Sequence, residues 1–134
     1  MVSKRLSREA GHRRKFLAIA DGTPESERAI SYAAHRAAAT NGALVLLHVI
    51  DSSDFQHFLG VEQIMREEAN TAASNALHAQ AVKVREAVGI EPELVVREGT
   101  TKEEIHKLIE EDQDIAVLVL AAGSTKEGPG PLVA

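Results

Sequence analysis

Short apolar runs alternate along this chain with stretches in which apolar residues recur every three or four positions. The runs are typical of buried strands, and the periodic stretches of helices with one face against a core. The runs predict strands at residues 16–20, 43–50, 93–97 and 115–120. The periodic stretches predict helices from residue 24 to Asn41-Gly42, from 61 to 88, and from about 101 through Ile109.

Local residues mark where these helices begin and end. Thr23 stands at an N-cap position, followed by Pro24 at the first helical position. Asn41-Gly42 and Gly89 supply helix ends. Thr101 and Glu104 have the spacing of a capping box. The long second helix carries an irregular apolar stripe made of Ile64, Met65, Ala69, Ala72, Ala73, Ala76, Leu77, Val84 and Val88.

Near-continuous apolar strands separated by amphipathic helices predict a parallel sheet covered on both faces. Because such crossovers are right-handed, we expect a doubly wound α/β domain. Ligands of these folds bind beyond the carboxyl ends of the strands, where the strand order reverses. The candidate positions are Asp21-Gly22, the residues after Val49, Gly99 and the loop after Leu120.

Composition is consistent with one domain. The chain has 134 residues, of which 44% are apolar, and no cysteine, so disulfides, thiolate metal sites and cysteine nucleophiles are excluded. No apolar run approaches the ~20 residues that span a bilayer, so we expect a soluble protein without a membrane partner. The six histidines have no metal-ligand spacing, and no serine lies in a nucleophile elbow, so we expect neither a metal site nor a catalytic residue.

Charge divides the chain into a basic start and an acidic body. Residues 1–15 hold six basic side chains against one glutamate, whereas the rest holds nine basic and nineteen acidic ones. The acidic body argues against binding to duplex nucleic acid. Residues 1–14 are interpreted as a disordered, solvated arm; a nucleic-acid tail and an Arg-rich transit peptide are the alternatives.

The last strand leads into a Gly-rich loop that contains Lys126. Exposed main-chain N–H groups of such a loop can bind a phosphate, and a lysine adds positive charge. However, Pro129 and Pro131 each remove a donor, and the Gly-Lys-Ser/Thr of a Walker A motif is absent. A phosphate site and a solvated loop both remain open.

Two strand ends resemble one known family. The sequence Ala20-Asp21-Gly22-Thr23-Pro24 is similar to the end of the first strand in the universal stress proteins, and Leu46-Leu47-His48-Val49-Ile50-Asp51 to the end of their second. The ordered set of elements extends the resemblance over roughly residues 15–124. His48 lies within the second motif, where we expect a half-buried structural histidine.

The resemblance implies an adenine nucleotide α-hydrolase-like, Rossmann-like fold and a cytoplasmic homodimeric stress regulator with protein clients. Many members bind ATP, with Mg²⁺, or AMP, and others bind no nucleotide and act through protein contacts. In binders the Asp after the first strand lies at the adenosine, and the main chain of the second-strand Val contacts adenine. These roles, with the phosphate loop, give the candidate site residues Ala20, Asp21, Val49, Leu120, Gly123, Ser124, Lys126, Gly128 and Gly130.

The chain departs from the family in its phosphate loop. Nucleotide-binding members have Gly-x2-Gly-x9-Gly-Ser/Thr after the fourth strand, where this chain has Ala121 and Ser124 at the first two Gly positions. The distal Gly-Ser/Thr would lie past Ala134, together with a fifth strand and a last helix. We therefore expect a domain from residue 15 to 134 that is truncated in or after the loop; the intact mass of the natural protein tests this. We do not expect an enzyme, although weak ATPase activity stays open.

Overall fold

The computed structural model describes residues 13–51 and 61–120 of the chain. Strands and helices alternate within this part, as the sequence predicts, and each predicted strand end lies within one residue of the observed one. The strands are β1 (Lys15–Ile19), β2 (Ala43–Ile50), β3 (Glu93–Glu98) and β4 (Ile115–Val119). The helices are α1 (Pro24–Ala39), α2 (Val61–Val88) and α3 (Thr101–Glu111).

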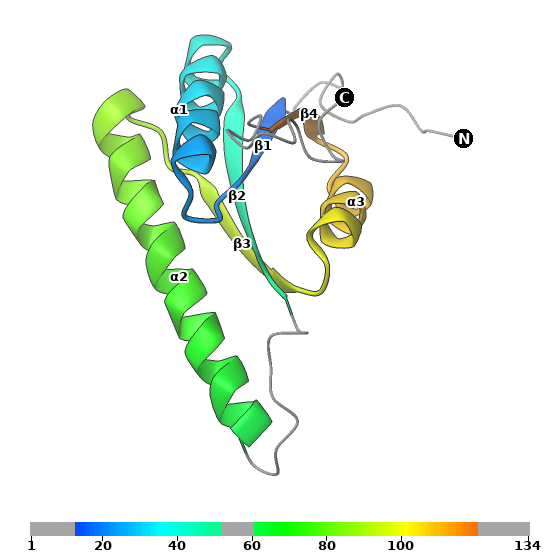
Figure 1. The fold of residues 1–134 in the computed structure, drawn as a ribbon. Helices are drawn as coiled ribbons and strands as arrows, with labels where there is room; N and C mark the ends of the chain where they lie inside the picture. Colours follow the sequence, from blue (N-terminus) through cyan, green and yellow to red (C-terminus); the bar gives the residue numbers. More distant parts are fainter. Residues whose placement is uncertain (1–12, 52–60, 121–134) are drawn as a thin grey trace, which may run out of the picture.

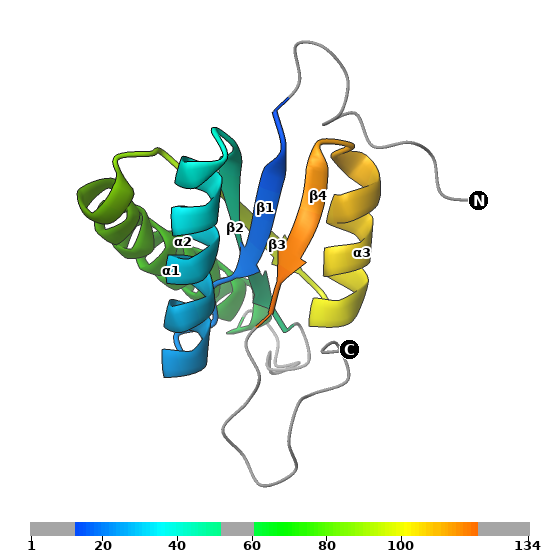
Figure 2. The same cartoon turned by 90° about the horizontal axis from the view of Figure 1, so that it is seen from above.

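The four strands form one parallel sheet in the order β3-β2-β1-β4. The chain builds outward from β1 to β2 and β3. It then returns to place β4 beside β1, on the side away from β2 (Figure 2). The strand order therefore reverses between β1 and β4. This confirms the doubly wound α/β fold and sets the expected ligand position at the carboxyl ends of these strands.

Helices cover both faces of the sheet (Figure 1). Because neighbouring residues of a strand point to opposite faces, β2 contributes to two cores. Leu46 packs in the cluster shared with α1 and α2, and Leu47 packs in the cluster shared with α3. Both side chains are fully buried.

The apolar stripe of α2 is narrower than the sequence predicts. Ala73, Leu77, Ala81 and Val84 are buried, but Ile64 is 55% exposed, and Ala72 and Ala76 are also exposed. The first turns of this helix reach past the sheet (Figure 1), yet Met65 and Ala69 there still pack against Ile50 and Ala73. Ile64, Ala72 and Ala76 instead lie on the exposed side of the helix. The predicted stripe is wrong at these three positions.

Both ends of α1 agree with the predicted signals. Thr23 is the N-cap, and its side chain accepts a hydrogen bond from the Ser26 N–H at 3.1 Å. At the other end the Gly42 N–H donates to Ala37 and the Asn41 N–H to Ala38, which is the hydrogen-bond pattern of a Schellman motif. Asn41 takes the left-handed conformation there, with φ of 57°.

The predicted capping box of α3 is wrong. Thr100 is the N-cap and makes no side-chain cap bond, so the helix begins one residue earlier than a Thr101 cap requires. Glu104 instead turns its carboxylate onto Gly99, where a Cβ atom would lie 2.7 Å from the Glu104 Oε2. Lys107 donates to the same oxygen at 3.3 Å. The predicted inner face is correct at Ile105 and Leu108, which are buried.

Residues 1–12 of the basic arm lie outside the described part, but its end is tied to the fold. The Arg13 Nη2 donates to the Gly42 carbonyl at 2.8 Å. Lys15 opens β1, where its ammonium lies 2.7 Å from Asp112 and 3.0 Å from Glu93. This ion triad joins β1, β3 and the end of α3 at the amino end of the sheet, opposite the expected ligand position.

Because of the Lys15 triad, we expect the free energy of unfolding to depend on pH in the alkaline range. Burial lowers the pKa of Lys15, but the hydrogen bonds and charges of Asp112 and Glu93 outweigh it, so the pKa lies above its ordinary value of 10.5. A raised folded-state pKa stabilises the fold fully below pH 10.5, and this stabilisation is lost as pH rises through the folded-state value. We expect Lys15→Met to cost about 1 kcal/mol at pH 7 and progressively less above pH 10.5, by urea unfolding. If the difference in unfolding free energy between wild type and Lys15→Met stays constant from pH 7 to 12, the triad is contradicted.

Candidate functional site

The structure brings the sequence-predicted strand ends together at one edge of the sheet. Ala20 is buried and directly follows β1, which pairs with β2 on one side and with β4 on the other. Val49 near the end of β2 and Leu120 just after β4 therefore flank the Ala20–Asp21 segment. The other predicted site residues, Gly123, Ser124, Lys126, Gly128 and Gly130, lie outside the described residues.

Asp21 is exposed and shapes the turn into α1. Its Oδ1 accepts from the Thr23 N–H at 3.0 Å and from the Thr23 hydroxyl at 2.7 Å. Both are local bonds typical of an Asx turn. Its Oδ2 has no hydrogen-bond partner among residues 13–51 and 61–120, so one carboxylate oxygen is left to accept from a ligand.

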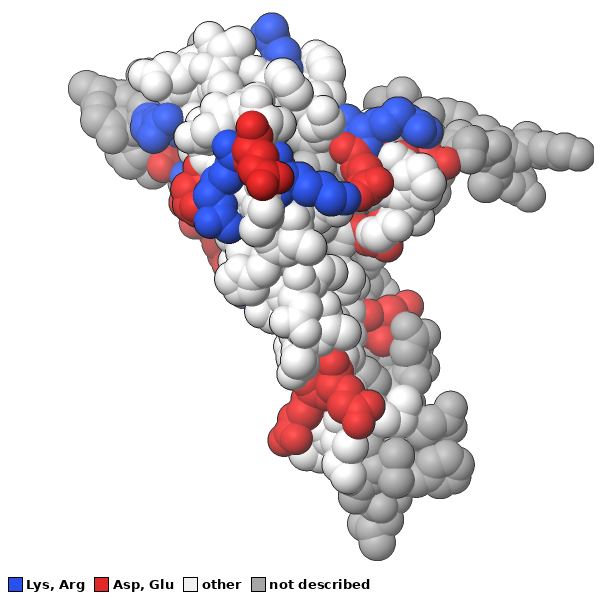
Figure 3. All heavy atoms as spheres, turned by 90° about the vertical axis from the view of Figure 1, so that its left-hand side faces the viewer, with Lys and Arg blue, Asp and Glu red and all other residues white. Residues whose placement is uncertain are grey.

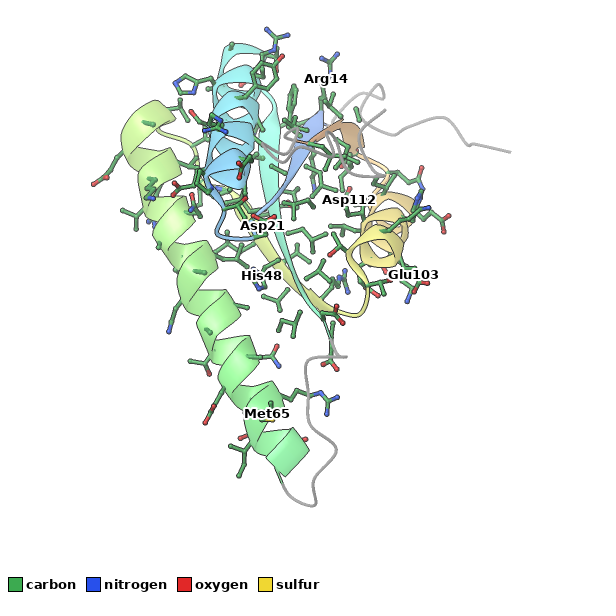
Figure 4. All side chains as sticks on the ribbon, in the orientation of Figure 1. Arg14, Asp21, His48, Met65, Glu103 and Asp112 are labelled. Atoms are coloured by element: carbon green, nitrogen blue, oxygen red, sulfur yellow. The ribbon has the colours of Figure 1, made fainter. Side chains whose placement is uncertain are left out.

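The Ala20–Asp21 peptide group is held from both sides. The His48 Nδ1 donates to the Ala20 carbonyl at 2.7 Å, and the Asp21 N–H donates to the Ser26 hydroxyl at 3.2 Å. Because a carbonyl can only accept, this Nδ1 carries the proton. The same Ser26 hydroxyl donates to the Ile19 carbonyl. Figure 4 shows Asp21 and His48 near each other below the first turn of α1.

The main chain of Val49 faces the end of β1. In a parallel strand the N–H and C=O of one residue point to the same neighbour, and successive residues alternate between neighbours. The Ile50 carbonyl accepts from Gly99 beyond β3, and the Leu47 carbonyl accepts from Ala20 beyond β1. Val49 therefore points both of its main-chain groups toward the β1 side, although the β1–β2 register ends at Ile19 and Leu47.

The arrangement offers polar groups for binding rather than metal ligands. Among residues 13–51 and 61–120, no group of three or more His, Asp or Glu side chains could hold a metal ion. The edge instead presents an acceptor oxygen of Asp21 beside a main-chain donor and acceptor at Val49. This set suits the edge of a flat heterocycle with a hydroxyl-bearing substituent.

A hollow of about 270 Å³ lies elsewhere, between α1 and α2. Ile30, Ala34 and Val84 contribute apolar lining, and neither Asp21 nor Val49 reaches it. Basic and acidic side chains are interspersed on this side of the molecule (Figure 3), for example in the 2.6 Å pair of Lys83 and Glu27. No single-sign patch marks it as a site for a strongly charged ligand.

The comparisons with known proteins assign the family. The model of the universal stress protein family matches residues 12–130. The chain belongs to the universal stress protein family. The resemblance carried by the ends of β1 and β2 is thereby confirmed. No relative was found among curated protein sequences.

Solved structures share the fold, among them two of proteins named universal stress proteins. The universal stress protein UspA from Lactobacillus plantarum is 21% identical with a TM-score of 0.71, over 91% of this chain and 83% of that one. The hypothetical protein MJ0577 is 21% identical with a TM-score of 0.72, over 86% and 81%. A universal stress protein in complex with cAMP is 18% identical with a TM-score of 0.60, over 81% and 71%. The TM-scores show that these proteins share the arrangement of strands and helices.

The described part of the chain contains no helix with the length and apolar character needed to cross a bilayer. This agrees with the sequence, in which charged residues interrupt every apolar stretch of α2.

Two polar residues near the site were not predicted. Ser26 is 6% exposed and Glu104 is 7% exposed, and each lies on the inner side of a helix near a carboxyl strand end. Ser26 follows the same helical spacing as Ala29, Ile30 and Ala33. A buried hydroxyl on an otherwise apolar helix face needs a hydrogen-bond partner. The position of Ser26 on that face is therefore the sequence signal for its contact with the end of β1.

Proposed function

We propose that this universal stress protein is a stress-response regulator that binds an adenine nucleotide at the carboxyl edge of its sheet, between the ends of β1, β2 and β4. The observation that carries the proposal is the main chain of Val49, for which residues 13–51 and 61–120 supply no hydrogen-bond partner on the β1 side, beside the acceptor oxygen of Asp21. An adenine edge has a ring-nitrogen acceptor next to an amino donor, which matches one main-chain N–H and C=O. Asp21 then accepts from a ribose hydroxyl or an amino group.

The family supports the proposal without deciding the ligand. A universal stress protein of the same fold is described in complex with cAMP. AMP, and ATP with Mg²⁺, are the other ligands to test. We further propose that the protein acts as a cytoplasmic homodimer and that binding, without catalysis, changes its contacts with client proteins.

Nucleotide extraction tests the proposal directly. Freshly purified protein is denatured, and the released small molecules are identified by mass spectrometry. Titration calorimetry with ATP, ADP, AMP and cAMP then gives the affinities. Release of an adenine nucleotide and measurable heat support the proposal, and absence of both from natural full-length protein would overturn it.

Asp21→Asn tests the proposed ligand contact of Asp21 separately from its hydrogen bonds in the turn. The asparagine keeps Oδ1 as an acceptor for Thr23, but it replaces Oδ2 with an amide that donates. We expect about tenfold weaker nucleotide binding, about 1.4 kcal/mol, with little change in the unfolding midpoint. Asp21→Ala is the comparison, because it removes both functions and should lower stability as well. Equal affinities for wild type and Asp21→Asn would show that Oδ2 does not contact the ligand.

A second function is favoured by the local bonds of Asp21 and by the loop sequence. Thr23 already occupies one carboxylate oxygen, and Pro129 and Pro131 remove donors from the expected phosphate loop. A homodimeric regulator that binds no nucleotide and acts through protein contacts has the same fold. Calorimetry without heat, combined with a dimeric mass by light scattering, would favour this function.

A further inference from the structure

The hydrogen-bond ladder between β1 and β2 ends one bond earlier than the geometry of a parallel pair would allow. Residues Lys15 to Ile19 pair in register with Ala43 to Leu47, and the Ala20 N–H adds a bond to the Leu47 carbonyl. In a continued ladder the next bond would run from the Val49 N–H to the Ala20 carbonyl. That carbonyl accepts from the His48 imidazole instead.

We propose that His48 ends this ladder and thereby keeps the main chain of Val49 open for the ligand. The imidazole Nδ1 takes the place of the Val49 N–H as the donor to Ala20. His48 is thus a positioning residue that acts through the main chain and need not touch the nucleotide. This inference rests on the proposed nucleotide site for its functional consequence, but its structural half is independent of any ligand.

The surroundings of His48 fit this role. Its side chain is half-buried on the sheet face covered by α1 and α2, whereas the side chain of Val49 packs on the α3 face. The imidazole therefore reaches the Ala20 carbonyl from one face without covering the main-chain groups of Val49 at the edge. Ser26 holds the other half of the same peptide group through the Asp21 N–H, so the end of β1 is kept in place from both sides.

Removal of the imidazole should let the ladder extend. In His48→Ala the Ala20 carbonyl loses its donor, and the Val49 N–H, which points toward the β1 side, is the next donor of the ladder. We expect amide hydrogen exchange at Val49, followed by NMR in the ligand-free full chain, to slow at least about tenfold relative to wild type. The Leu47 amide is the internal reference, because it is paired in both proteins and reports any loss of global stability.

His48→Asn is the matched control. The asparagine Nδ2 is separated from Cα by the same number of bonds as the imidazole Nδ1, so it can donate to the Ala20 carbonyl. We expect this variant to keep the fast exchange of Val49 and a nucleotide affinity within about threefold of wild type. His48→Ala should bind AMP or ATP about tenfold more weakly, which corresponds to the loss of one or two hydrogen bonds.

The two readouts separate the inference from the proposed function. If wild type binds no adenine nucleotide, the proposed function fails, while Val49 exchange still decides whether His48 ends the ladder. Unchanged or faster Val49 exchange in His48→Ala, with Leu47 unaffected, would overturn the inference even if the nucleotide binds. Slower Val49 exchange with unchanged nucleotide affinity would show that His48 ends the ladder but that the ligand does not use the Val49 main chain.

Discussion

We expect Leu46→Ala and Leu47→Ala each to lower the free energy of unfolding by about 3 kcal/mol, because both side chains are fully buried in close-packed clusters. The two neighbours point to opposite faces of β2, so they test the two cores separately. Urea unfolding followed by far-UV circular dichroism gives the values. Comparable costs are a signature of a sheet covered on both faces.

An exposed residue provides the baseline for this pair. Val82 on α2 is 45% exposed, and Val82→Ala should change stability by no more than about 0.5 kcal/mol. Leu46→Met and Leu47→Met, which keep side-chain volume, should each cost less than about 1.5 kcal/mol. A cost below 1 kcal/mol for only one of the two alanine variants would mean that the corresponding face is not packed as the structure shows.

The order and nature of the elements could be predicted because each strand has a short apolar run at its centre. The run from Ala43 to Ile50 is shorter than a typical helix, which favours a strand, and it matches β2 residue for residue. The apolar spacing predicted burial wrongly where a residue's position in the fold, rather than its spacing, decides its exposure. Ile64 has the right spacing for a helix core, but the beginning of α2 extends past the sheet, which no local pattern encodes.

The candidate site could be predicted only as a location. The carboxyl ends of β1 and β2 carry Asp21 and Val49, and the structure places these ends side by side. The hydrogen bonds that hold them could not be read from the sequence. The bond of His48 to Ala20 joins residues 28 positions apart and depends on the register of two strands.

The start of α3 shows a different limit. Thr101 and Glu104 have capping-box spacing, but Thr100 and Glu103 have it as well. The sequence alone does not choose between the two registers. The structure places Thr100 at the N-cap, and Glu104 is then buried against Gly99. Tertiary packing therefore decided a boundary that local chemistry left ambiguous.

We expect Gly42→Ala, a substitution at a buried position, to lower the free energy of unfolding by about 3 kcal/mol. A Cβ atom at this position would lie 2.6 Å from the main-chain oxygen of Arg14. That oxygen accepts from the Ala43 N–H at 2.8 Å, so it cannot move away without breaking the first bond between β1 and β2. Thermal unfolding followed by circular dichroism measures the effect.

The adjacent Asn41 supplies the control, because it shares the helix end without the close approach. Asn41→Gly places a glycine at φ of 57°, a conformation that glycine adopts freely, and should change stability by less than about 1 kcal/mol. If the two variants unfold at similar temperatures, the close approach of α1's end to β1 is not present. If only Gly42→Ala unfolds early, the register that begins at Ala43 is confirmed. That register also determines which carbonyl at the end of β1 faces His48, namely that of Ala20.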